Sequence, residues 1–348
     1  MGSFFIEFRD PLFSIIIFFS IVFVITFISY WWGRYKRKED NKDIDRFLKQ
    51  FKTLPSKNEL KVLISSGELS EKSWLLLANS FYKNGDYEKA IEIYNEILEV
   101  NKGANTKETM FLLGKTYFRA GFLERSKQIF LEILKKYPRT PEALKYLLLV
   151  YEHMRDYKSA MDVLEPLDEL EEDISLDSEY LNALMILNNA KMDGETKAQK
   201  LLEIYNQNHN LIYMIFEYLF RVNPQLAWEN LDHSKVDVLV PVLWNLRSKD
   251  LNLDIISKSG YLRELYSARG DISLAKSSSI FEFDILIKLE KKANATLGFE
   301  YVCSSCKGTY PFAFNRCSAC HAIDSATIEI SLSRDYMREF GEESNSFQ

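Results

Sequence analysis

The stretch WLLLANSFYKNGDYEKAIEIYNEIL, from Trp74 to Leu98, decides the fold because its pattern recurs twice further along the chain. Each copy has a large residue near its start, a turn signal in the middle and a small residue shortly after the turn. In the first copy these are Trp74, Gly85-Asp86 and Ala90. The equivalents are Met110, Gly121 and Ser126 in the second copy, and Leu144, Asp156-Tyr157 and Ala160 in the third.

A period of about 34 residues with two apolar stripes per period is the tetratricopeptide pattern, in which two antiparallel helices form each unit. The large residue packs on the small one where the helices approach closely, and glycine serves the turn between them. Weaker turn signals follow at Asp193-Gly194 and Gly270-Asp271, and a last helix is expected in FEFDILIKLEKK, Phe281 to Lys292. The sequence predicts an all-α solenoid over residues 71–292, whose concave face binds peptides or protein surfaces.

Ahead of the repeats, residues 11–33 read PLFSIIIFFSIVFVITFISYWWG and carry no charge. About 20 apolar residues suffice for a helix to cross a bilayer, so we expect a transmembrane helix over residues 12–32. The basic run RYKRK, Arg34 to Lys38, follows it directly, which predicts a cytoplasmic body and a periplasmic N-terminus. A cleaved signal peptide is disfavoured because no basic leading region and no A-x-A-like cleavage site are present.

The cysteines all lie in CSSCKGTYPFAFNRCSAC, as two C-x-x-C pairs: Cys303, Cys306, Cys317 and Cys320. Thiols stay reduced in the cytoplasm, so a metal site is favoured over disulfides. Four thiolates suit one tetrahedral metal ion, zinc or iron. Strands are expected at 299–302, 309–314 and 326–330, which predicts a small β module of zinc-ribbon or rubredoxin-like type. The module has few core residues, so the metal is expected to supply much of its folding free energy.

No motif in the chain predicts catalysis. No phosphate-binding loop, G-x-S-x-G or H-E-x-x-H motif occurs. The histidines are His153, His209, His233 and His321, and His321 is only a spare candidate ligand beside Cys320. A net charge of −6 argues against a nucleic-acid partner. We therefore interpret the cysteine module as a structural clip on the repeats. A nucleic-acid-binding finger and an electron carrier are the less favoured interpretations.

This order of parts resembles the LapB (YciM) family of bacterial inner-membrane proteins over nearly the whole chain. That family has an N-terminal span, tetratricopeptide units and a terminal C-x2-C-x10-C-x2-C knuckle of rubredoxin type. The resemblance makes Cys303, Cys306, Cys317 and Cys320 the metal ligands. The family usually has glycine, proline and tryptophan at or near the positions where this chain has Lys307, Ser318 and Ile323.

The resemblance implies a non-enzymatic adaptor in the inner membrane that regulates lipopolysaccharide synthesis or assembly. Its partners would be the membrane protease FtsH and the deacetylase LpxC, presented on the solenoid, with homo-oligomers left open. The alternatives are a membrane-tethered scaffold for another envelope or motility complex and, third, a rubredoxin-like redox protein.

The expected organisation has six parts. They are a periplasmic N-terminus (1–11), the transmembrane helix (12–32), a basic juxtamembrane segment with a leading helix (33–70), the repeats (71–292), the metal-binding knuckle (299–332) and a polar tail (333–348).

Overall fold

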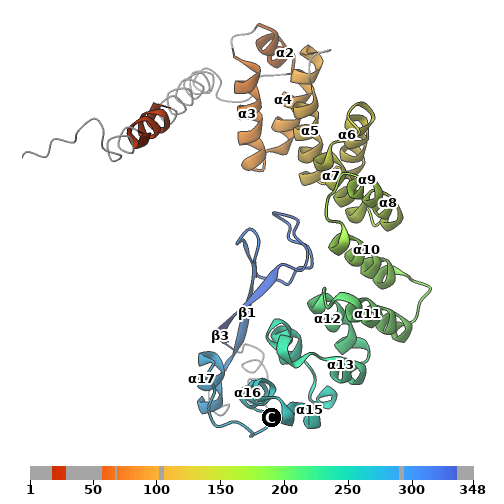
Figure 1. Ribbon diagram of the computed structural model, residues 1–348, viewed down its shortest axis with the longest axis vertical. Coiled ribbons are helices and arrows are strands. Elements are labelled where there is room, and N and C mark those ends of the chain that lie inside the picture. Colours follow the sequence, from red (N-terminus) through yellow and green to blue (C-terminus); the bar gives the residue numbers. More distant parts are fainter. Residues whose placement is uncertain (1–17, 29–56, 67–68, 102–105, 290–293, 335–348) are drawn as a thin grey trace, which may run out of the picture. The chain divides into compact units, whose positions relative to one another are not determined.

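The computed structural model describes residues 18–28, 57–66, 69–101, 106–289 and 294–334. The chain divides into two compact units, Met1–Leu170 and Glu171–Gln348 (Figure 1). Residues 18–28 form a helix, drawn in red in Figure 1, whose large apolar side chains are exposed, Phe23 by 67%.

The predicted transmembrane helix lies largely outside the described residues, since only residues 18–28 of its range 12–32 are described. Among the helices of the described ranges, none combines the length and the apolar character that crossing a bilayer requires. The expected N-terminus at 1–11 and the basic run from Arg34 to Lys38 lie outside the described residues as well.

The first unit consists of paired helices that follow the predicted repeats (Figure 1). The helices are α2 (Lys57–Ser66), α3 (Glu71–Lys83), α4 (Tyr87–Val100), α5 (Lys107–Arg119), α6 (Leu123–Lys136), α7 (Pro141–His153), α8 (Tyr157–Asp162) and α9 (Leu164–Asp168). The pairs α3/α4 and α5/α6 are the first two repeats. In the third repeat the second helix is split into α8 and α9, because Pro166 has no amide hydrogen to donate to the carbonyl of Asp162.

The turn inside each repeat depends on one residue with a left-handed backbone. Gly85 and Gly121 have φ angles of 84° and 82°, as their positions in the sequence predict. The third turn uses Arg155, with a φ of 59°. A side chain at such a position costs about 1–2 kcal/mol, and the packing of α7 on α8 must compensate for it.

Small residues let the two helices of a repeat approach closely. Ala90 is fully buried, and only 1% of the surface of Trp74 is exposed. In the second repeat the Ser126 hydroxyl donates a 2.8 Å hydrogen bond to the Gly114 carbonyl of the facing helix. A Cβ atom on Gly114 would come within 2.9 Å of the Phe130 ring, so only glycine fits there without a shift.

The second unit is also mostly helical, and its helices after α11 are shorter (Figure 1). They are α10 (Ser175–Asn188), α11 (Gly194–Asn208), α12 (Ile212–Val222), α13 (Pro224–Asn230), η1 (His233–Leu239), α14 (Val240–Trp244), η2 (Ser248–Asp250), α15 (Leu253–Lys258), α16 (Gly260–Arg269) and α17 (Phe281–Leu289). The predicted turn at Asp193 is confirmed, since its carboxylate caps α11 by accepting a 2.9 Å bond from the Thr196 amide.

The repeat expected around Gly270 is only half formed. Gly270 ends α16 with a φ of 77°, as a turn glycine does. No helix begins at the expected position, because residues 271–280 are irregular, and the next helix, α17, begins at Phe281 and packs on α16. The Ala275 amide donates to the Ser267 hydroxyl at 3.0 Å, which ties this segment back onto α16. Ala275 therefore does not take the role that Ala90 has in the first repeat.

A three-stranded antiparallel sheet in the order β2-β1-β3 completes the second unit. Its strands are β1 (Ala295–Cys303), β2 (Thr309–Tyr310) and β3 (Ala326–Arg334). The long pair β1/β3 runs in register from Ala295 opposite Arg334 to Cys303 opposite Ala326, and packs on α17 and η1. The strand expected at 309–314 is shorter than predicted. We refer to residues 295–334 as the ribbon.

Replacing Ala90 by leucine should overpack the first repeat, because Ala90 lies at a helix crossing with no exposed surface. The free energy of unfolding should fall by roughly 1–3 kcal/mol, measurable by thermal or urea denaturation followed by circular dichroism. Glu88→Leu, on the exposed face of the same helix, serves as the control and should change stability little. Equal stability of the two variants would contradict the packing described for this crossing.

Candidate metal centre

The two C-x-x-C pairs adopt the same backbone geometry. The Cys303 amide donates to the Gly308 carbonyl and the Lys307 amide donates to the Cys303 carbonyl, both at 2.9 Å. The second pair repeats these bonds, from the Cys317 amide to the Ala322 carbonyl and from the His321 amide to the Cys317 carbonyl, again at 2.9 Å. Each pair is therefore a tight knuckle that turns two sulfurs toward the same side.

The residue after each knuckle's second cysteine has a left-handed backbone. Lys307 has a φ of 61° and His321 a φ of 65°. Glycine would adopt this conformation with the least strain, and a side chain there costs about 1–2 kcal/mol. The family that this chain resembles usually has glycine at the position of Lys307. The left-handed backbone of Lys307 is therefore more strained than that of a glycine would be.

The four sulfur atoms converge, with all of them within 4.8 Å of one another. The distance from Cys303 Sγ to Cys320 Sγ is 3.6 Å, and from Cys306 Sγ to Cys317 Sγ it is 3.7 Å. Tetrahedral sulfurs bound at about 2.3 Å from a zinc ion lie about 3.8 Å apart. The predicted ligands thus come together from both knuckles in a geometry that can hold one metal ion. Four sulfur ligands suit either zinc or iron.

Each knuckle buries one sulfur and exposes the other. Cys303 and Cys317 are buried, while Cys306 and Cys320 are exposed. The Cys303 sulfur lies 3.3 Å from the Ser325 hydroxyl, and the Cys317 sulfur lies 3.2 Å from the Tyr310 hydroxyl. Hydroxyl donors beside thiolates orient a ligand and stabilise its charge.

The pKa values of the two buried thiols shift in the opposite direction to that of Cys306. Burial raises the pKa of Cys303, but hydrogen bonds from the Cys306 amide and the Ser325 hydroxyl outweigh it and lower the pKa to about 6. Burial also raises the pKa of Cys317, but hydrogen bonds from the Cys320 amide and the Tyr310 hydroxyl outweigh this effect and lower the pKa. At Cys306 the Gly308 amide lowers the pKa, but burial and the neighbouring sulfurs together raise it to about 11.

Thiolates at these sulfur–sulfur distances repel one another. A bound cation removes that repulsion and deprotonates the remaining thiols.

Arg316, between the knuckles, attaches them to the first helix of the second unit. Its guanidinium donates a 2.8 Å bond to the Asp177 carboxylate and a 3.0 Å bond to the His321 carbonyl. It also lies over the Tyr180 ring, 5.0 Å from the centroid. The arginine side chain is 9% exposed, so this ion pair is shielded from water and stronger than a surface pair.

Asp324, after the second knuckle, holds the turn between α11 and α12. The Leu211 amide donates a 3.0 Å hydrogen bond to the Asp324 carboxylate. Leu211 and His209 both have left-handed backbones, with φ angles of 56° and 55°. Two such non-glycine residues in one turn are strained, and the ribbon supplies an acceptor that compensates.

Contacts further along the ribbon continue this attachment. The Tyr213 and Tyr301 hydroxyls are 3.4 Å apart, and the Trp244 indole donates to the Thr296 hydroxyl at 3.2 Å. Leu297 and Ile323 belong to the hydrophobic core of the helical unit. The ribbon therefore contacts α10, α12 and α14 of the second unit.

The attachment residues carried no signal in the sequence. In the sequence, Arg316 and Asp324 are simply two charged residues of opposite sign in a short module. Their partners Asp177 and Leu211 lie more than a hundred residues away along the chain. Of the histidines, His321 is not part of the four-ligand group. His153 bonds through Nδ1 to the Leu149 carbonyl of its own helix, and His209 ends α11. No histidine of the described residues joins a metal-ligand cluster.

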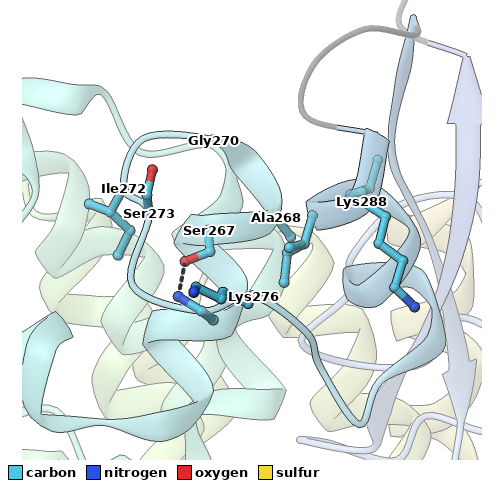
Figure 2. A pocket seen from close by; sticks show the side chains of 10 residues that line it. Ser267, Ala268, Gly270, Ile272, Ser273, Lys276 and Lys288 are labelled. Atoms are coloured by element: carbon cyan, nitrogen blue, oxygen red, sulfur yellow. Dashed lines mark hydrogen bonds between the residues drawn. The ribbon is translucent and has the colours of Figure 1, made fainter.

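A cavity of about 710 Å³ lies between the end of α16, the irregular segment 271–280 and α17 (Figure 2). Small and aliphatic residues line it, together with Lys276 and Lys288, and the Ala275–Ser267 hydrogen bond crosses its wall. The Lys288 ammonium pairs with Asp284 of its own helix. The charged side chains among the lining residues are those of Lys276 and Lys288.

Comparison with known proteins supports the repeats. Models of the tetratricopeptide repeat match residues 71–104 and 111–168. No curated protein matches the chain. Two similar solved structures are the MamA RS-1 ArsTM double mutant and a tetratricopeptide repeat protein from Parabacteroides merdae ATCC 43184.

The MamA structure is 18% identical and covers 46% of this chain and 89% of its own, with a TM-score of 0.35. The Parabacteroides structure is 15% identical and covers 73% of this chain and 96% of its own, with a TM-score of 0.38. The two family matches, rather than these distant structures, identify the repeats.

Asp324 gives a test of how the ribbon attaches. Asp324→Asn keeps an acceptor for the Leu211 amide and tolerates the left-handed backbone of position 324, whose φ is 49°. Asp324→Gly tolerates the backbone equally but removes the acceptor, and should lower the free energy of unfolding by about 1 kcal/mol relative to asparagine. Urea denaturation of both variants measures the difference. If glycine proves as stable as asparagine, the Asp324–Leu211 bond does not stabilise the turn.

Proposed function

We propose that the protein is a non-enzymatic adaptor, anchored in the inner membrane with its body in the cytoplasm, that regulates lipopolysaccharide synthesis or assembly. In this proposal its repeats present the protease FtsH and an LpxC-type deacetylase to each other. An anchor confines the repeats to the membrane surface and raises their effective concentration near membrane partners.

The observation that carries the proposal is the order of parts. The tetratricopeptide repeats are of a class that mediates protein–protein interaction, so the chain is a protein-interaction scaffold in its architecture. A four-cysteine knuckle that follows such repeats, after an uncharged N-terminal segment, is the order seen in the LapB (YciM) family. The exposed apolar side chains of residues 18–28 fit an anchor, since water solvates such a surface poorly.

The metal ion has a structural role in this proposal. One zinc or iron ion bound by the four cysteines would fix both knuckles, and with them Arg316 and Asp324, which lie between and after the knuckles. The ion would then hold the ribbon on the helices of the second unit. Because the ribbon already contacts helices of that unit, partner binding is expected on the repeats of the first unit.

Crosslinking in native membranes, followed by mass spectrometry of the purified protein, tests the proposed partners. Crosslinked peptides from FtsH or from a lipopolysaccharide-synthesis enzyme are the expected result. Crosslinks to a different envelope or motility complex, with none to these enzymes, would replace the proposal by that of another membrane-tethered scaffold.

Removing one ligand by Cys306→Ser should release the metal, because three thiolates and a hydroxyl bind it much more weakly. Elemental analysis should find about one zinc or iron per chain in the wild type and a large loss in the variant. Limited proteolysis should then cut within the ribbon while the repeats of the first unit stay intact. Ser304→Ala, within the same knuckle but not a ligand, is the control and should keep its metal. A wild-type protein without metal would refute the structural role.

A further inference from the structure

The cavity beside α16 and α17 combines aliphatic walls with two cations at its rim (Figure 2). Ile272, Leu286 and Ile287 line it, and the lining residues Lys276 and Lys288 are exposed. Its volume of about 710 Å³ lies in the range of pockets that hold drug-sized ligands. The cavity can therefore receive several side chains of a peptide, apolar ones against its walls and an acidic one at its rim.

One of the two cations is available to an acidic ligand. The Lys288 ammonium pairs with Asp284 of its own helix, and Arg269, near the end of α16, pairs with Asp271. Within the described ranges of the chain, the Lys276 ammonium forms no ion pair. A carboxylate that entered the cavity would gain most from contact with Lys276, since no other acid competes there.

The chain leaves the ribbon close to this cavity. Arg334, the last residue of β3, pairs with Ala295, the first residue of β1. Ala295 follows the end of α17 at Leu289 by six residues, and both strands pack on α17. The segment 335–348 lies outside the described residues. It therefore begins beside the helix whose residues 286–288 line the cavity, and six extended residues span about 20 Å.

The sequence of this segment, DYMREFGEESNSFQ, complements the cavity. It has four acidic side chains against a single arginine, so it carries a net negative charge opposite the free lysine. Tyr336, Met337 and Phe340 are large and apolar, and their spacings of three and four residues would bring them to one face of a helical turn. Glu339 directly precedes Phe340, so an acidic and an aromatic side chain are adjacent.

We propose that the segment 335–348 binds in the cavity of its own chain, with Phe340 against the aliphatic wall and Glu339 at Lys276. The bound segment would join the end of the ribbon to α16 and α17. A tether of a few residues gives the segment an effective concentration in the millimolar range, so a weak intrinsic affinity is enough to occupy the cavity. A free ligand of the same chemistry lacks this advantage.

Photo-crosslinking tests the proposal on the full-length, metal-loaded protein in detergent. The photoreactive residue p-benzoylphenylalanine takes the place of Phe340, and mass spectrometry locates the crosslinks. The expected result is crosslinks to residues 267–288 within one chain. The same residue in place of Phe312, which is 79% exposed on the ribbon, is the control and should give none there. Crosslinks that join two chains would assign the cavity to a second copy, and either that result or no crosslink to residues 267–288 would overturn the proposal.

Charge reversal then tests the contact with Lys276. Lys276→Glu should lower the crosslinking yield from position 340 at least about threefold, because attraction becomes repulsion. Adding Glu339→Lys should restore the yield. Lys200→Glu makes the same change of charge at an exposed position on α11 and should leave the yield unchanged. Circular dichroism confirms that each variant is folded. An equal loss in the Lys276 and Lys200 variants, or no recovery in the double variant, would contradict the contact.

This inference does not depend on the proposed function, because it concerns two parts of one chain and its test uses the purified protein alone. Failure of the crosslinking from position 340 would leave the adaptor proposal untouched. Failure to find lipopolysaccharide enzymes in native membranes would likewise leave the cavity and its segment in place.

Discussion

The structure depends on one packing constraint: a helix pair of a tandem repeat has apolar surface that only a neighbouring element can cover. In the first unit the next repeat covers it, and the buried side chains of α3, α4 and α5 form one continuous cluster. In the second unit the repeats shorten and one pair remains half formed. There the ribbon contributes Leu297 and Ile323 to the hydrophobic core, so a β element covers apolar surface of the helices.

The two units therefore differ in what lies against their helices. In the second unit, the chain's own ribbon lies along α10, α12 and α14 and holds them through Arg316 and Asp324. A metal ion in the knuckles would thus act on the folding of the second unit, while the residues that match tetratricopeptide-repeat models lie in the first.

The sequence predicts those features that repeat or that follow fixed spacing. The three tetratricopeptide units and the turns at Gly85 and Gly121 were predictable because packing at helix crossings requires the same residue types each time. The convergence of four sulfurs followed from two C-x-x-C pairs. The Arg155 turn and the irregular segment 271–280 were not predictable, since tertiary contacts there override local preference. Contacts such as Arg316 with Asp177 join residues too distant for any pattern to indicate.

The division of the sulfurs into one buried and one exposed atom per knuckle has a kinetic consequence for any bound ion. Chelators, oxidants and competing thiols can approach only through the exposed atoms of Cys306 and Cys320, one from each knuckle. Exchange of the ion would begin there, while Cys303 and Cys317 keep their hydroxyl neighbours and retain it to the last. The lifetime of a bound ion in the cell would then depend on what covers these two exposed sulfurs.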